Sequence, residues 1–208
     1  MDELKGVAVG ADVSFDELFL FNVDHEFVSI FDHVPDESHD VTYTSLYDGC
    51  TNITMETKQG QVLFAHTEDI NPITRDMGIM VKFTITNTEG EIIEDFLDYY
   101  LPGFLSGSKF GYNSNGVMMG MNCVLQRGIN LNGIPRKFMC RSLYSVKNAD
   151  EARRKLEAKP GMATSYMFHY VQKTKHGIEN SVIETANTDC NQYVTMFTPG
   201  RFYHHCNM

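Results

Sequence analysis

The spacing of apolar residues divides the chain into a short helical beginning and a longer part rich in strands. Apolar positions from Leu4 to Val13 are typical of one helix. Ser14 and Glu17 have the spacing of a capping box, and the apolar residues Leu18, Phe19, Leu20, Phe21 and Val23 follow, which predicts a second helix. Two helices are therefore expected before residue 34.

Residues 34–49 are polar and turn-forming and show no helical period, which predicts a linker. His39 has acidic neighbours in this segment. Adjacent carboxylates in a loop are far more often solvated surface than a metal site, so no metal is assigned there.

After this linker the hydrophobic period changes to two. Residues 50–56 alternate, Lys58-Gln59-Gly60 predicts a turn, and residues 61–66 resume the alternation, which together predict a hairpin. Two later helices are expected, Pro135–Val146 and one capped by Asn148. This order predicts a layered α+β fold. Further strands are expected at Gly78–Thr86, Glu91–Tyr99, Val117–Val124, Ala163–Val171, Ser181–Glu184 and Tyr193–Thr198.

Composition narrows the class of protein. The chain has 208 residues, enough for one sizeable core, with 42% hydrophobic and 21% charged residues, as in ordinary globular domains. Its net charge of −10 leaves no broad basic surface for phosphates, so no nucleic-acid partner is expected. No stretch approaches the length of a membrane span and no secretory signal opens the chain, so a cytoplasmic protein without a membrane partner is expected.

Five cysteines at irregular spacing indicate neither a disulfide framework nor a structural zinc site. One of them, Cys50, follows Gly49 at the start of the alternating run. If the bond between them were cut, Cys50 would carry a nucleophilic thiol and a free α-amine that could act as its base near neutral pH. The alternative is that Cys50 is a small buried hydrophobe, as free cysteines usually are.

His66-Thr67-Glu68-Asp69 ends the second strand of the hairpin, so the antiparallel return brings it beside Cys50. Alternation puts Glu68 and Asp69 on opposite faces, and only one of them can point at the thiol. The alternative is that both are ordinary turn residues.

Asn122 is an amide inside an apolar strand and would need partners if buried. An amide aimed at a developing oxyanion can contribute about 3 kcal/mol to acyl transfer. The segment before it also fits a hairpin turn at Asn115-Gly116. Asn207 lies in a second strand-like segment, where His204 and His205 face opposite ways and cannot chelate one metal.

These segments together resemble a known family, the N-terminal-nucleophile (Ntn) cysteine hydrolases of the isopenicillin-N acyltransferase / Tan β-alanyl-amine hydrolase family. The resemblance covers nearly the whole chain. The segments that carry it are residues 3–22, Gly49-Cys50-Thr51, His66–Asp69, Gly111–Asn122 and His204–Asn207.

The resemblance implies an αββα Ntn-hydrolase sandwich that cleaves itself before Cys50. Residues 1–49 would be a helical pro-segment and linker, and residues 50–208 the catalytic chain, which stays associated with it. Cys50, Asp69, Asn122 and Asn207 would be catalytic, with Asp69 the polar partner of Cys50. Asn52, Glu68 and Tyr112 would bind substrate. Family members act on linear amides, such as β-alanyl amines or penicillin side chains, without metal or cofactor.

The sequence departs from the family pattern in two ways. The family has an arginine late in its chains that contributes to the site, and this arginine has no counterpart before Met208. The chain is therefore expected to be truncated at both ends and to lack part of the sandwich at its C-terminus. It is also expected to self-associate, and a homo-oligomer is left open. Asn52 stands where some members have a hydroxyl that assists self-cleavage. Two functions follow: an amide hydrolase or acyltransferase with a small-molecule amide substrate, or a catalytically silent paralogue acting as a binding module.

Overall fold

A computed structural model describes residues 1–31, 49–69, 72–124, 129–187 and 192–207. The predicted linker, with His39, lies outside the described residues except for Gly49.

The chain begins with three helices, where the sequence predicted two: α1 (Asp2–Ala11), α2 (Phe15–Phe21) and α3 (Asp24–Phe31). The predicted capping box is confirmed, since the Glu17 backbone N–H donates to Ser14 Oγ over 3.1 Å. The break after α2 depends on a tertiary contact. The buried Asn22 donates to the Gly103 carbonyl and accepts from the Leu105 N–H.

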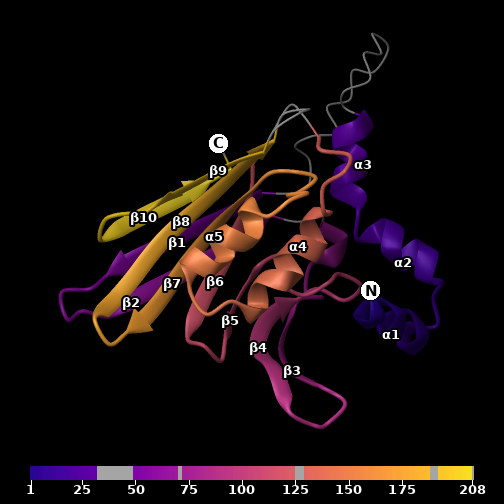
Figure 1. Cartoon of the computed structure of the whole chain (residues 1–208), viewed down its shortest axis with the longest axis horizontal. Coiled ribbons are helices and arrows are strands. Elements are labelled where there is room, and N and C mark those ends of the chain that lie inside the picture. The colour runs from indigo at the N-terminus through magenta and orange to yellow at the C-terminus, as the bar shows by residue number, and fades with distance from the viewer. Residues whose placement is uncertain (32–48, 70–71, 125–128, 188–191, 208) are drawn as a thin grey trace.

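The strands form two antiparallel sheets (Figure 1). The small sheet has the order β10-β1-β2, and the large sheet runs in chain order from β3 to β9. Two helices, α4 (Arg136–Ser142) and α5 (Ala149–Glu157), lie between β6 and β7 in the sequence. The strands are β1 (Gly49–Glu56), β2 (Val62–Asp69), β3 (Ile79–Thr86), β4 (Ile92–Tyr100), β5 (Phe110–Asn113), β6 (Val117–Cys123), β7 (Tyr166–Thr174), β8 (Gly177–Asn187), β9 (Gln192–Phe197) and β10 (Phe202–Cys206).

The large sheet is the middle layer of the molecule. One face packs on α4 and α5, which cross in front of it in Figure 1. This interface is the main core and includes Met121, Leu143, Leu156 and Phe168, all fully buried. The other face packs on the small sheet, where Thr54 of β1 meets His169 of β7. The predicted α+β class is therefore confirmed.

The predicted strands are confirmed with shifted boundaries. β7 begins three residues after the expected Ala163, and β8 is far longer than the expected Ser181–Glu184. The sequence also missed β5, a short strand whose neighbours β4 and β6 define it. Strands inside a sheet take their length from their partners, so local alternation does not fix their ends.

The outer face of the small sheet carries exposed apolar side chains. These are Ile53, Met55, Leu63 and Phe202, the last 59% exposed. The described residues thus form three layers, helices, large sheet and small sheet, and none of them forms a second helical layer over this outer face.

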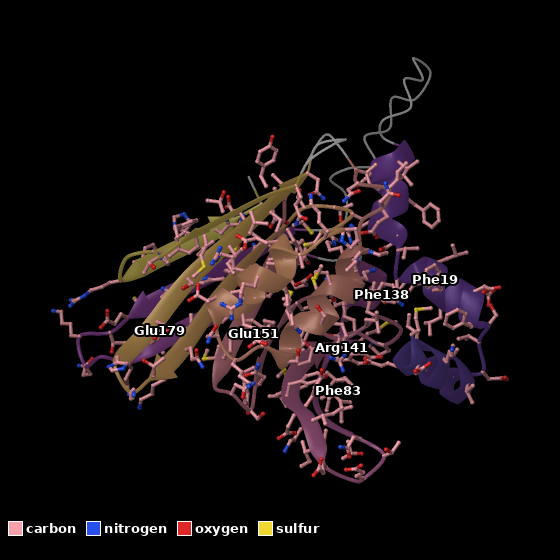
Figure 2. The ribbon with its side chains drawn as sticks, in the orientation of Figure 1. Phe19, Phe83, Phe138, Arg141, Glu151 and Glu179 are labelled. Atoms are coloured by element: carbon pink, nitrogen blue, oxygen red, sulfur yellow. The ribbon has the colours of Figure 1, made fainter. Side chains whose placement is uncertain are left out.

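The N-terminal helices are fastened to α4 and do not form a separate unit. The rings of Phe19 and Phe138 lie 5.8 Å apart across α2 and α4 (Figure 2). Arg141 Nε on α4 donates to Glu3 over 2.7 Å, and Lys137 Nζ pairs with Asp24 over 2.7 Å. No helix among the described residues is long and apolar enough to cross a membrane.

Two buried titratable groups make stability depend on pH in opposite directions. Burial raises the pKa of Asp98 to about 7, although hydrogen bonds from Tyr144 and from the Gly107 N–H oppose this shift. Burial between the sheets lowers the pKa of His169 to about 4. A raised carboxyl pKa costs stability as pH rises from 3.8 towards 7, whereas a lowered histidine pKa costs stability as pH falls from 6.5 towards 4.

We expect Asp98→Asn to reveal the contribution of His169. In the wild type the two effects largely cancel between pH 4 and 6.5. In the variant the free energy of unfolding should rise with pH over this range, by on the order of 2 kcal/mol more than in the wild type. Urea unfolding at several pH values measures this slope. An unchanged slope would contradict the raised Asp98 pKa.

Candidate active site

Strand β1 carries the candidate nucleophile at the interface of the two sheets. Alternation points Cys50, Asn52 and Thr54 inward, and all three are buried. The opposing strand β6 comes close because residue 120 is a glycine. A Cβ there would overlap Asn52 Oδ1 and the Phe64 ring.

Two predicted asparagines hold the backbone of Cys50. The Cys50 N–H donates to Asn207 Oδ1 over 2.5 Å, and Asn122 Nδ2 donates to the Cys50 carbonyl over 2.6 Å. Asn207 is itself fixed by a 2.7 Å hydrogen bond from its Nδ2 to the Cys123 carbonyl. The structure therefore brings together three residues that are up to 157 positions apart in the chain.

The thiol of Cys50 faces Glu68. Sγ donates to Glu68 Oε2 over 3.6 Å, and Cys50 is only 2% exposed. The same oxygen lies 2.7 Å from His66 Nε2. The other carboxylate oxygen, Oε1, pairs with Lys109 Nζ, and the two side chains of this pair are 7% and 10% exposed. A buried ion pair thus lies beside the candidate nucleophile.

Asn52 joins this cluster to the asparagines. His66 Nδ1 lies 2.7 Å from Asn52 Oδ1, and Asn52 Nδ2 donates to Asn122 Oδ1. The polar side chains form a closed ring that begins at the thiol of Cys50 and ends at its carbonyl. Every step of this ring is a hydrogen bond inside the sheet interface, so the site is polar but enclosed.

The two carboxylates of the hairpin lie on opposite faces, as alternation predicted. The register pairs Cys50 with Glu68 and Gly49 with Asp69. A Cβ on Gly49 would lie 2.7 Å from Asp69 Oδ2, so the Asp69 carboxylate is against Gly49 on the outer face of the small sheet. The structure therefore gives the thiol contact to Glu68, and places Asp69 on the carbonyl side of the Gly49–Cys50 bond.

Two residues differ from what the sequence predicted. Tyr112 was expected at the site but lies away from it, and Lys109 lies in the site but was not expected there. Tyr112 pairs with Met118 of β6. Met118 is four residues from Asn122, which is about 13 Å at the usual rise of a strand. Tyr112 therefore lies away from Cys50, and its side chain is half exposed. Lys109 could not be predicted as a site residue, because a single lysine just before a short strand looks like surface.

The ligand atoms of Cys50, His66 and Glu68 lie within 4.8 Å of one another and could hold a metal ion. The Lys109 ammonium already neutralises Glu68 there and would repel a cation. A cavity of about 510 Å³ lies elsewhere, at the opposite end of the hairpin. It is lined by residues that include Thr54, Glu56, Asn180 and Arg201 and does not reach Cys50.

We expect Gly120→Ala to separate the sheets. The added methyl group overlaps Asn52 and Phe64, so the free energy of unfolding should fall by roughly 1–3 kcal/mol. Gly10→Ala in α1 is the matched control, because its Cβ meets nothing within 4 Å and should not destabilise the protein. Urea unfolding of both variants measures the difference, and equal stability would contradict the close packing at Gly120.

Comparison with known proteins gives the family. A family model described as acyl-coenzyme A:6-aminopenicillanic acid acyl-transferase matches residues 55–199. The beta-alanyl-dopamine/carcinine hydrolase of Drosophila melanogaster is 29% identical over 160 residues, which cover 74% of this chain and 40% of that protein. The acyl-coenzyme A:6-aminopenicillanic-acid-acyltransferase 40 kDa form of Emericella nidulans is 25% identical over 208 residues, which cover 99% of this chain and 51% of that protein. The chain thus spans about half or less of the length of these relatives. Because the family model matches well over half of the chain, the protein belongs to the acyl-coenzyme A:6-aminopenicillanic acid acyl-transferase family.

Proposed function

We propose that the chain is a self-processing amide hydrolase or acyltransferase of the Ntn type, in which Cys50 forms a thioester with the acyl group of a linear amide. The observation that carries this proposal is the fixation of Cys50 on three sides. Asn207 holds its N–H, Asn122 holds its carbonyl and Glu68 contacts its thiol. The backbone N–H and carbonyl of any buried residue need partners, but here two side-chain amides supply them and a carboxylate meets the thiol as well.

In the proposed first step the Cys50 sulfur attacks the Gly49 carbonyl carbon, and the bond from that carbon to the Cys50 nitrogen breaks. Water then hydrolyses the thioester, leaving residues 1–49 and a chain that begins with Cys50. Gly49 suits this step because the Asp69 carboxylate occupies the space that a side chain at residue 49 would need. We assign Asp69 to the carbonyl side of this bond and, after cleavage, to the polar surroundings of the site.

The processed site would use the freed α-amine as base and the asparagines as hydrogen-bond partners. Asn207 Oδ1 already accepts from the Cys50 nitrogen and would orient the amine. The Asn122 Nδ2 donor, which holds the Cys50 carbonyl here, is the nearby amide suited to an acyl oxyanion. Since the family model begins at residue 55, the role of Cys50 rests on this geometry and on the resemblance.

The two pieces would stay together after cleavage. The contacts of Glu3, Phe19, Asn22 and Asp24 with α4 and with residues 103–105 do not depend on the Gly49–Cys50 bond. A second helical layer over Ile53, Met55, Leu63 and Phe202 would complete an αββα sandwich. The substrate class, linear amides such as β-alanyl amines, is proposed from the relatives.

Self-cleavage is the first test of this function. The purified protein should contain pieces of 49 and 159 residues (208 − 49 = 159), and Cys50→Ala should remain one chain. Cys206→Ala is the matched control and should cleave normally, because Cys206 opposes Thr51 on the outer face of the sheet. Intact mass and N-terminal sequencing measure the result. A new N-terminus other than Cys50, or cleavage in Cys50→Ala, would contradict the assignment and favour a silent binding module.

Inhibition separates a thiol mechanism from a metal mechanism. On β-alanyl amines, alkylation of thiols should abolish amide hydrolysis in both the wild type and Cys206→Ala, because the reacting sulfur is that of Cys50. EDTA should leave the rate unchanged. Among the described residues, one group of side chains could hold a metal ion, namely Cys50, His66 and Glu68, and the Glu68 carboxylate is already paired with Lys109. Reversible loss of activity with EDTA would require a metal mechanism in place of this one.

A further inference from the structure

Self-cleavage needs a base that the processed enzyme does not need. The α-amine of Cys50 can serve as base only after the Gly49–Cys50 bond has been cut. Before that, the Cys50 nitrogen is an amide whose N–H donates to Asn207 Oδ1. Some other group must therefore accept the thiol proton in the first reaction. Residue 52 is an asparagine already bonded to His66 and Asn122, so it supplies no hydroxyl.

Glu68 is the group that meets the thiol. It lies directly across the ladder from Cys50, on the inner face, and its Oε2 accepts from Sγ over 3.6 Å. Asp69 cannot share this contact, because its side chain lies on the opposite face against Gly49. The contact is enclosed, since Cys50 is buried and the Glu68 side chain is 7% exposed.

The surroundings hold this carboxylate in one place and give it a counter-charge. Lys109 Nζ pairs with Oε1, which leaves Oε2 directed at the thiol and at His66. Removing one partner of a buried pair would leave the other charge unpaired, so each side chain is held in place by the other. Lys109 acts here as a positioning residue.

Hydrogen-bond direction also fixes the His66 ring. The Cys50 carbonyl can only accept, so Asn122 must direct Nδ2 to it and Oδ1 to Asn52. Asn52 Nδ2 then donates to Asn122, which leaves Asn52 Oδ1 facing His66 Nδ1. His66 must therefore donate from Nδ1, and because the Glu68 carboxylate can only accept, Nε2 must also carry the hydrogen of its 2.7 Å bond to Oε2. The hydrogen bonds that start at the Cys50 carbonyl thus fix the orientation of His66, and His66 in turn orients the Glu68 carboxylate.

We infer that Glu68 is the base of the self-cleavage reaction, and that the α-amine of Cys50 replaces it in amide turnover. This inference rests on the proposed function. As the bond from Sγ to the Gly49 carbonyl carbon forms, the thiol proton moves to Glu68 Oε2. As the bond from that carbon to the Cys50 nitrogen breaks, the nitrogen takes the proton, which regenerates the carboxylate. A carboxylate is a weaker base than a thiolate by about four pKa units in reference peptides, so the proton moves during attack and not before it.

The test compares rates of self-cleavage in the full-length chain. Pulse-labelled protein is sampled at intervals, and the fraction of intact 208-residue chain is measured by mass. Glu68→Gln keeps the shape of the side chain but cannot take the proton, and should slow cleavage by about 100-fold or more. Glu56→Gln, the same change at the far end of β1, should cleave at the wild-type rate. Once the Glu68→Gln chain has been cleaved, its amide turnover should be reduced by a smaller factor than its rate of self-cleavage.

A double variant distinguishes a base from a structural counter-ion. Glu68→Gln alone leaves the Lys109 charge buried and unpaired, which could slow cleavage by disturbing the fold. Glu68→Gln with Lys109→Met removes both charges, so it should recover thermal stability but still cleave about 100-fold or more slower than the wild type.

Cleavage of the double variant at the wild-type rate would overturn the inference. So would wild-type cleavage in Glu68→Gln, or equal losses of cleavage and turnover. If the wild type itself does not cleave, the proposed function fails, and this inference fails with it.

Discussion

The close packing of the small sheet on the large sheet is the constraint on which the candidate site depends. Gly120 brings β6 against Asn52 and Phe64, and any side chain at that position would hold the sheets apart. Two residues further along β6, this approach lets Asn122 reach the carbonyl of Cys50. A polar side chain only a few atoms long can hold a backbone carbonyl across a sheet interface only when the backbones are this close.

The same packing encloses charged and polar groups that need partners. Glu68 pairs with Lys109 through one oxygen and with His66 through the other, and Asn52 links His66 to Asn122. Such a network is unfavourable if any member is missing and rigid when all are present. Glu68 therefore has one available geometry, with the thiol of Cys50 beside it. The rigidity of the site comes from this requirement for complete pairing.

The N-terminal helices have a structural role that does not depend on cleavage. Asn22 bonds the chain at residues 103 and 105, while Arg141 on α4 holds both Glu3 and Glu94. These contacts join α1 and α2 to the large sheet through α4. Residues 1–31 therefore contribute to the packing of the domain that carries the site, and cutting the chain at Gly49 would leave these contacts in place.

The sequence by itself determined the order of the elements, because the hydrophobic period and the caps are local. The capping box at Ser14, the hairpin after Cys50 and the opposite faces of Glu68 and Asp69 follow from the chemistry of neighbouring residues. It also pointed to Asn122 and Asn207, since an amide in an apolar strand needs a partner. Only the tertiary structure decided which carboxylate meets the thiol, because that depends on the register of β1 with β2. It also revealed Lys109, whose pairing across elements leaves no trace in the spacing of residues.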